Sequence, residues 1–387
     1  MPETLDEVAP GLIGGAALGA PGTRGGPVAR TRRIGLIVAR SDSQADGIRD
    51  YTHRLGRSLR ELGVAAEIWE WTDGRPVAPA SECRLDALDA VVLQYNPFSF
   101  GRWGFAPGLP RFLAGLRRRP GRPRIAVMFH ETYVDMNSPS WVLMGGWQRG
   151  QLRAVQACAD VCLCSIQPWT ERLRRSGRGG RGGRAPVHHL PVASNLPDAR
   201  TARVPARERL GADEDTIVLS CMGLRHPGRL AEHVLGAAQA IGARRRVLLF
   251  DLGPGEPGRR PLGGDVELCA TGFLDEREVA EHIAASDIFL APYRDGVSTR
   301  RTTVMAALQN GVPVLGTAGH LSDDVLTRAP ELTLTGPDAP EDFADAAAAL
   351  ADDPERRARL GAAGRALYER CFDWPVLAER LLGVLDA

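Results

Sequence analysis

The sequence predicts an α/β protein with two doubly wound domains in tandem, each a parallel sheet covered by helices. Apolar, β-branched runs of strand length alternate with segments of helical periodicity, which is typical of βαβ units. The alternation occurs twice along the 387 residues, a length that suits two domains. The two series meet at residues 191–205 (PVASNLPDARTARVP), where prolines and polar residues interrupt the pattern.

The first series begins at residues 34–39 (IGLIVA), an apolar run suited to a strand buried on both faces. Residues 48–62 carry apolar side chains at helical spacing and stop before Gly63, so they predict a helix with a glycine at its end. Further elements are expected in this order: strands at 65–71 and 88–95, a helix at 109–116, a strand at 124–130, a helix at 147–157 and a strand at 160–165.

The second series repeats the arrangement. We expect strands at 216–223, 245–253, 266–273, 287–292 and 312–317, with helices at 230–241, at 276–285 and from about Arg300. Each series therefore predicts a Rossmann-like domain. The expected boundaries are a first domain at 31–195, a second at 196–370, and a last helix at 371–387 that crosses back to the first domain.

Composition excludes several classes of function. The formal net charge is +1, so no overall field draws the chain to nucleic acid or anionic lipid. All 48 basic residues are arginine, which excludes a catalytic lysine. The seven scattered cysteines, including Cys158, Cys162 and Cys164, lack the paired spacing of a zinc site; we expect small apolar side chains in a reducing cytoplasm.

Two glycine-rich segments are expected to lie outside the folded domains. Residues 1–30 are too short and too rich in glycine to span a membrane, and we interpret them as a flexible leader. Residues 174–186 (RRSGRGGRGGRAP) invite an RNA-binding interpretation. Because the tract has no interleaved aromatic residue and the protein is nearly neutral, a solvated loop is the simpler prediction.

The most unusual stretch is 291–317 (APYRDGVSTRRTTVMAALQNGVPVLGT), in which Arg300 and Arg301 stand where a loop becomes a helix. The N–H groups of a helix start favour an anion, and arginine binds phosphate oxygens in a two-pronged manner. The pattern therefore predicts a phosphate site, with Thr302 in the first turn of the helix and Ser298 or Thr299 as its N-cap. In the alternative, one arginine pairs with Asp295 or Glu281 and the other is solvated.

Several segments, taken in order, carry a family resemblance. They are LIVARSDSQADGIRDYTHRLGRSLRELG with Gly47 in its loop, MFHE with His130 and Glu131, PVASNLP, CMGLRHPGR with Arg225 and Arg229, ATGFLDEREVAEHIAASDIFLAPYRDG, and ERCFDWPVLAERLLGVL. From residue 34 onward the chain resembles a glycosyltransferase of the GT-B fold, close to family 4, the retaining sugar-nucleotide enzymes. The resemblance implies two Rossmann-like domains that face each other across a cleft.

The resemblance also implies roles for individual residues. The catalytic group is expected at His130, Glu131 and Asp295, and the donor and acceptor loops at Gly47, Asp295, Gly296 and Val297. The donor diphosphate is expected at Arg225, Arg229, Ser298, Arg300, Arg301 and Thr302. One position departs from the family pattern, because the second of its two donor-loop glutamates falls at Ala306. A branch with D-G-x-S-x-R-R in this loop fits better, and ribose recognition stays open.

His130 follows a buried strand, where a histidine can donate to a sugar hydroxyl and stabilise developing charge; alternatively it caps its own loop. No residue stands out as a nucleophile, so we favour same-face attack with the departing diphosphate as proton acceptor. We expect no metal. The acids at 213–215 precede a strand, as in a surface turn, and His226 and His233 lie on different helix faces. The pair at 188–189 has no acid nearby in the sequence.

Two long aromatic loops, 96–105 and 132–141, are expected to shape the acceptor site. Tyr95, Phe98, Trp103 and Tyr133 are candidate stacking surfaces, although they could equally cover the core.

The sequence thus predicts a retaining, metal-independent glycosyltransferase. It would move a hexosyl-type sugar from a nucleoside-diphosphate sugar, its only cofactor-like co-substrate, to a small-molecule acceptor, as in antibiotic biosynthesis. We expect a cytoplasmic enzyme with no nucleic-acid partner and no stable membrane insertion. Two alternatives remain: a sugar-nucleotide 2-epimerase, which needs no acceptor, and a non-catalytic sugar-nucleotide binder.

Overall fold

The structure, a computed structural model, describes residues 31–41, 46–78, 84–133, 139–176, 185–224 and 226–387. The predicted leader (1–30), most of the RGG tract (177–184), the loop residues 134–138 and Arg225 lie outside the described residues. Residues Arg32–Ala387 form one unit by their backbone contacts.

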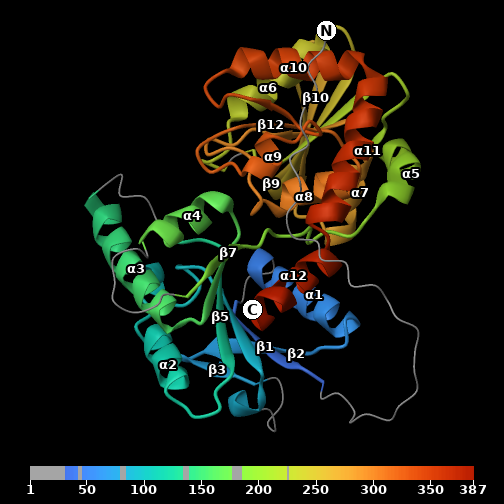
Figure 1. Ribbon diagram of the computed structural model, residues 1–387. Coiled ribbons are helices and arrows are strands. Elements are labelled where there is room, and N and C mark those ends of the chain that lie inside the picture. Colours follow the sequence, from blue (N-terminus) through green and yellow to red (C-terminus); the bar gives the residue numbers. More distant parts are fainter. Residues whose placement is uncertain (1–30, 42–45, 79–83, 134–138, 177–184, 225) are drawn as a thin grey trace, which may run out of the picture. The chain divides into compact units, whose positions relative to one another are not determined.

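The first sheet has seven strands in the order β3-β2-β1-β4-β5-β6-β7, all parallel except the β2–β3 pair. Its strands are β1 (Arg33–Ala39), β2 (Ala65–Thr72), β3 (Arg75–Val77), β4 (Ala90–Tyr95), β5 (Arg124–Phe129), β6 (Val161–Cys164) and β7 (Val187–His189). Between them lie α1 (Gly47–Glu61), α2 (Gly108–Arg117), α3 (Pro139–Cys158), α4 (Gln167–Ser176) and the 3-10 turns η1 (Leu85–Ala87) and η2 (Arg102–Gly104). Figure 1 shows the sheet with helices around it.

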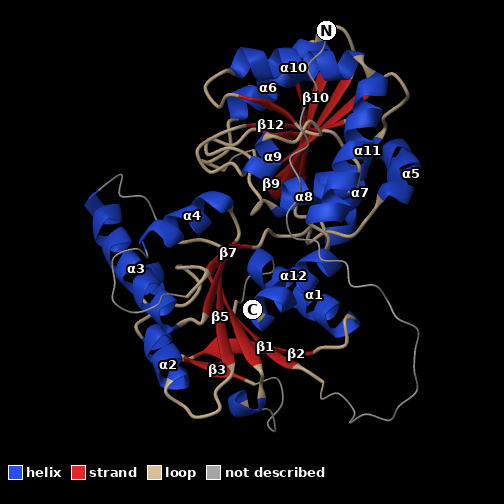
Figure 2. Cartoon of the chain, viewed as in Figure 1, coloured by secondary structure: helices blue, strands red, loops and turns tan. Residues whose placement is uncertain are grey.

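The second sheet has six strands in the order β10-β9-β8-β11-β12-β13. Its strands are β8 (Ile217–Met222), β9 (Val247–Gly263), β10 (Val266–Gly272), β11 (Ile288–Ala291), β12 (Val314–Thr317) and β13 (Thr333–Thr335). The helices are α5 (Arg203–Leu210), α6 (Ala231–Gly242), α7 (Glu276–Ala285), α8 (Thr302–Gln309), α9 (Asp324–Thr327), α10 (Pro340–Asp352), α11 (Pro354–Cys371) and α12 (Trp374–Asp386), with the turn η3 (Arg200–Ala202). Figure 2 shows its strands, in red, among helices in blue.

The strands form where the sequence is apolar without alternation, because both faces of each sheet are covered. Every residue of β4 and of β11 is buried. The helix expected at 48–62 is α1, which has the side chain of Asp46 as its N-terminal cap. It ends as predicted before Gly63, whose φ of +80° lies in the region that favours glycine. The two-sheet α/β architecture predicted from the alternation is confirmed.

The last helix, α12, packs against α1, next to the first sheet (Figure 1). Arg32 pairs with Asp386 at 2.6 Å, and Arg124 Nη1 donates to the carbonyl of Leu385 at 3.0 Å. The ring of Trp374 lies 5.3 Å from that of Tyr51 on α1. The C-terminal segment is thus attached to the first half of the chain.

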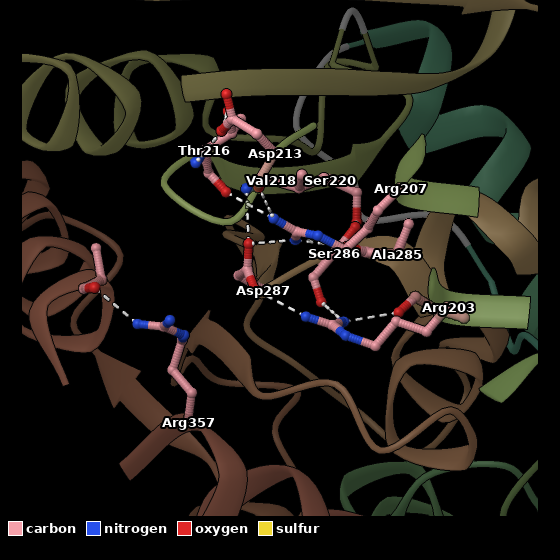
Figure 3. Close-up of polar contacts among 12 residues, drawn as sticks. Arg203, Arg207, Asp213, Thr216, Val218, Ser220, Ala285, Ser286, Asp287 and Arg357 are labelled. Atoms are coloured by element: carbon pink, nitrogen blue, oxygen red, sulfur yellow. Dashed lines mark hydrogen bonds and ion pairs between the residues drawn. The ribbon is translucent and has the colours of Figure 1, made fainter. Parts of the chain in front are cut away.

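A buried ion cluster fixes the edge of the second sheet at which its strands begin (Figure 3). The Asp287 carboxylate accepts from Arg203, Arg207 and the backbone N–H of Val218, each at 2.8 Å. Both arginines belong to α5, so the cluster attaches that helix to the starts of β8 and β11. Asp213 lies nearby and accepts from the N–H and the hydroxyl of Thr216, so the acids at 213–215 form a turn, as predicted.

Three predicted elements have different bounds in the structure, and helices α4, α5, α10 and α11 were not predicted. Helix α3 begins at Pro139 rather than near 147; its first turns expose Trp141, Val142 and Leu143, so they lack the periodicity of a buried face. Strand β9 continues to Gly263 through exposed, glycine- and proline-rich residues that carry no strand signal. Helix α8 begins at Thr302, two residues later than expected.

Candidate functional site

A cavity with a volume of about 640 Å³ is lined by loops of both sheets. Residues near the first sheet supply most of its wall: Ala39, Arg40, Ser41, Asp46, Gly47, Ile48, Tyr51, Asn96, Phe98, Ser99, His130, Glu131 and Val192. The second sheet contributes Arg300, Arg301 and Thr302. We call this space the shared cavity.

A second cavity, of about 330 Å³, is lined only by residues of the second half of the chain, which lie in or after strands of the second sheet. Its lining is Met222, Gly223, His226, Arg229, Leu252, Gly253, Pro254, Tyr293, Arg300, Arg301, Thr302 and Thr303. We call it the inner cavity. Arg300, Arg301 and Thr302 line both spaces, so the start of α8 lies where they meet, at the carboxyl edge where open α/β sheets bind ligands.

Arg300 and Arg301 are both bound to Asp295. Arg300 Nη2 lies 2.5 Å from one carboxylate oxygen, and Arg301 Nη2 lies 2.8 and 3.0 Å from the two oxygens. Arg300 Nη1 also reaches Glu131 at 3.1 Å. Burial alone would raise the pKa of Asp295, but Arg301 and Arg300 together hold that pKa below its ordinary value. The alternative of one paired and one solvated arginine is wrong, since both are paired and largely buried.

A third guanidinium completes the cluster. Arg229 and Arg301 both lie over the ring of Tyr293, each 4.1 Å from its centroid. Arg229 Nη2 donates to the carbonyl of Met222, whereas its Nε and Nη1 are buried without a partner. The Nε atoms of Arg300 and Arg301 are also buried and unpaired. Of the three arginines, Arg300 and Arg301 pair with carboxylates, those of Asp295 and Glu131, and Arg229 does not.

The unpaired donors of these arginines make this junction a candidate site for an anion. Buried donors without acceptors cost free energy, roughly 1–3 kcal/mol each. Burial and the neighbouring Arg300 lower the pKa of Arg301. Keeping the Arg301 guanidinium charged therefore costs free energy. No side chain caps α8, so no side chain accepts from the N–H groups of its first turn. The first residue of the helix, Thr302, lines both cavities. An oxyanion bound where the two cavities meet would lie next to the start of α8 and to Arg300 and Arg301.

Comparison with known proteins agrees with this geometry. Residues 228–353 match the family described as Glycosyl transferases group 1, and the match includes Arg229 and the arginine pair. A GDP-mannose-dependent monoacylated alpha-(1-6)-phosphatidylinositol monomannoside mannosyltransferase from Corynebacterium glutamicum is 29% identical over 74% of this chain and 76% of its own length. A D-inositol 3-phosphate glycosyltransferase from Thermobispora bispora is 24% identical over 92% and 95% of the two chains.

Solved structures with the same architecture include a sucrose-phosphate synthase from Thermosynechococcus elongatus, with a TM-score of 0.65 at 16% identity, over 92% of this chain and 98% of that one. WaaG, a glycosyltransferase involved in lipopolysaccharide biosynthesis, gives 0.60 at 13% identity, over 91% and 99% of the two chains. The chain is a GT-B glycosyltransferase.

His130 in this glycosyltransferase lies at the carboxyl end of β5 and lines the shared cavity, where it was expected. Its Nε2 lies 2.7 Å from Gln94 Oε1. A carboxamide oxygen only accepts, so Nε2 carries the proton and Nδ1 is left as an acceptor. Burial lowers the pKa of His130 to about 4, so the ring is neutral at pH 7. In this tautomer Nδ1 is the ring's acceptor, and the expected donation from His130 to a sugar hydroxyl stays a prediction.

Four predicted residues of the donor loop do not line either cavity. Both carboxylate oxygens of Asp295 accept from the arginines, and its expected contact with the sugar stays a prediction. The side chain of Ser298 is wholly buried, and so is that of Val297, which packs at Gly316. Gly296 has a φ of +87°, and a Cβ there would meet the backbone of Gly319 at 2.3 Å. In the structure these residues shape the loop that precedes α8.

The predicted cap of α8 is also wrong: Arg301 is the N-cap, the Ser298 hydroxyl is buried without a partner, and the Thr299 hydroxyl is bonded elsewhere. The Ser298 carbonyl accepts from the N–H of Arg301, and the Thr299 hydroxyl bonds Ser165. Ala306, where the family glutamate would stand, is wholly buried in the core and contacts no cavity. Arg225 lies outside the described residues.

Of the aromatic candidates for the acceptor site, Phe98 alone lines the shared cavity. Tyr95 is wholly buried, and its hydroxyl accepts from Gln151, so it belongs to the core. Trp103 is 63% exposed, and Tyr133 lies under Arg149 at 3.9 Å; neither lines the cavity.

Sequence reasoning missed Tyr51 and Tyr293 as site residues. Tyr51 lines the shared cavity from α1, where helical spacing marks it only as a core residue. Tyr293 directly follows the predicted strand, so its place at the carboxyl edge was a usable signal. Gly47 does line the shared cavity, and its carbonyl accepts from Asn195 at 2.9 Å.

Among the described residues, no group of three or more His, Cys, Asp or Glu side chains could hold a metal ion. Within the same part of the chain, no helix has the length and apolar character needed to cross a membrane.

Proposed function

We propose that this glycosyltransferase is a retaining, metal-independent enzyme that transfers a hexosyl-type sugar from a nucleoside-diphosphate sugar to a small hydroxylated acceptor. The observation that supports this most is the cluster of Arg229, Arg300 and Arg301, with unpaired donors where the two cavities meet. A diphosphate brings several acceptor oxygens and negative charge, which match these donors.

The two cavities divide the substrates between them. The nucleoside binds in the inner cavity, which is lined by the second sheet alone, as is usual for a ligand of one Rossmann-like sheet. The sugar and the acceptor share the larger cavity, where His130 and Glu131 stand opposite the arginines. The scissile bond then lies at the start of α8.

In the proposed reaction the acceptor attacks from the face that the diphosphate leaves, and a diphosphate oxygen takes the acceptor proton. Guanidinium groups fixed beforehand stabilise the charge that develops on the leaving group. Neutral His130 accepts from a sugar hydroxyl and holds the ring in place. The arginines thus perform the charge neutralisation for which other enzymes use a cation, which is why we propose that no metal is required.

The nucleotide and the acceptor need experiments. Because the Corynebacterium relative uses GDP-mannose, GDP is the first nucleotide to test, beside UDP, dTDP and ADP. The nucleotide that binds the folded protein raises its melting temperature. Acceptors to screen are polyols and sugar phosphates, suggested by the relatives' names, and small aromatic natural products of the kind that antibiotic tailoring enzymes modify.

The decisive assay is release of nucleoside diphosphate with and without acceptor. Release that depends on the acceptor supports the transferase. Release or isomerisation with donor alone supports a 2-epimerase-like enzyme, and binding without turnover across the acceptor panel supports a non-catalytic binder.

A further inference from the structure

The residue before the arginine pair, Thr299, is wholly buried and is held from several sides. Its N–H donates to Asp323 Oδ2 at 2.6 Å, and its carbonyl accepts from the N–H of Val192 at 2.9 Å. Its hydroxyl donates to the carbonyl of Ser165 at 2.6 Å and accepts from His189 Nε2 at 2.9 Å. Val192, Ser165 and His189 all lie at or after the last strands of the first sheet.

Asp323 connects the same two parts of the molecule. It lies in the loop between β12 and α9 and is wholly buried. Its Oδ1 accepts from the N–H of Gln167, the first residue of α4, at 2.5 Å, while Oδ2 accepts from Thr299. His189 is its one ion-pair partner in the described part of the chain, at 3.6 Å.

A buried carboxylate without an arginine partner is an expensive way to join two loops. Burying a charge costs several kcal/mol unless hydrogen bonds satisfy it, and an apolar contact is often at least as stable. The carboxylate fixes the orientation of two backbone N–H groups, those of Gln167 and Thr299, through two short charge-assisted hydrogen bonds. The peptide that they fix precedes Arg300 and Arg301.

We propose that Thr299 and Asp323 are positioning residues for donor binding. They tie the arginine-bearing loop to the first sheet, so that both guanidinium groups point to the junction of the cavities. The inference rests on the proposed role of that junction as the diphosphate site. It predicts that loosening Thr299 weakens diphosphate binding although neither residue touches the ligand.

The test compares two substitutions that differ by one hydroxyl. Thr299→Val keeps the shape and loses the hydroxyl, whereas Thr299→Ser keeps the hydroxyl. We expect Thr299→Val to raise the Kd for GDP or UDP, measured by calorimetry, about fivefold to tenfold, the factor for one buried hydrogen bond. Thr299→Ser should stay within about twofold of the parent. In turnover assays the loss should be mainly in donor KM.

A matched control separates positioning from stability. Thr216→Val removes another buried hydroxyl, which donates to Asp213 at the far edge of the second sheet (Figure 3). It should lower the melting temperature without changing the Kd. If Thr299→Val does the same, the inference is wrong.

A second variant decides the matter if Thr299→Val does not fold. Asp323→Asn keeps the size of the side chain and one accepting oxygen, but places an NH₂ group against one of the two N–H groups. A weakened Kd in folded Asp323→Asn supports the inference, and an unchanged Kd overturns it. If replacing Arg300 and Arg301 by Ala also leaves the Kd unchanged, the proposed function itself is wrong; if only the arginine variant weakens binding, the positioning inference alone is wrong.

Discussion

At two opposite edges of the second sheet a carboxylate pairs with two arginines, Asp287 with those of α5 and Asp295 with Arg300 and Arg301. At Asp287 the arginines of α5 are satisfied: Arg203 also donates to the carbonyls of Ala284 and Ser286, and Arg207 to those of Ala285, Asp213 and Thr216 (Figure 3). At Asp295 the guanidinium Nε atoms are buried without acceptors and their residues line cavities. A cluster that completes itself stabilises the fold, whereas one that leaves donors open is prepared for a ligand.

The largest expected effect comes from breaking the open cluster. Replacing Arg300 and Arg301 together by Ala removes the charges that face the leaving group. We expect kcat/KM to fall by about 10² to 10³, the range for losing donors to a developing anion. The Kd for nucleoside diphosphate should rise at least about tenfold, one charge-assisted bond or more. Calorimetry and initial rates measure both. Unchanged values would show that this cluster is also merely structural.

The converse prediction concerns the closed cluster. Arg207→Ala leaves the buried Asp287 with one arginine and removes bonds to three carbonyls. Breaking a buried ion pair costs about 3–5 kcal/mol, so the free energy of unfolding in urea should fall by roughly that amount. In conditions where the variant is folded, its Kd for nucleoside diphosphate should equal that of the parent. A weakened Kd would remove the distinction between the two clusters.

The fold could be predicted from the sequence because a strand that is buried on both faces consists of a continuous apolar run, as in β4 and β11. It also placed His130, Arg300 and Arg301 correctly, since each follows a strand of a parallel sheet and such strand ends meet at one edge.

The ion pairs between distant residues could not be predicted from the sequence. Glu131 and Arg300 are 169 positions apart, and no local pattern joins them. A sequence also does not show which way the carboxylate of a loop residue such as Asp295 turns. For Tyr95 the sequence left an acceptor contact and a core position equally open, and its ring is wholly buried in the core.

Two buried histidines, His130 and His189, make the stability of the protein depend on pH. Burial lowers the pKa of His130 to about 4; burial also lowers that of His189 to about 4, helped by Arg380. Unfolded histidine titrates near 6.5, so between about 6.5 and 4 the unfolded chain binds more protons. Stability is complete above that window and falls as the pH drops through it, by about 1.4 kcal/mol per unit for each histidine.

His130→Gln removes one of these two contributions. Urea unfolding at pH 7 and pH 5 should show a smaller loss of stability in the variant than in the parent, while Arg207→Ala should retain the parental pH dependence. An equal slope in parent and His130→Gln would mean that His130 is not buried as the structure has it.

The smallest expected effect lies on the acceptor side of the shared cavity. Phe98 is 46% exposed and lines that cavity, whereas Trp103, in the same loop and 63% exposed, does not. Phe98→Ala should raise acceptor KM several-fold, since one half-exposed aromatic contact contributes about 0.5–1.5 kcal/mol, and should leave donor KM unchanged. Trp103→Ala is the matched control and should change neither constant. Both variants remove an exposed ring from one loop. A rise in acceptor KM confined to Phe98→Ala would show that the acceptor lies in the cavity, next to the arginines, and not on the loop surface. Equal effects of the two variants would place the acceptor on the loop surface instead.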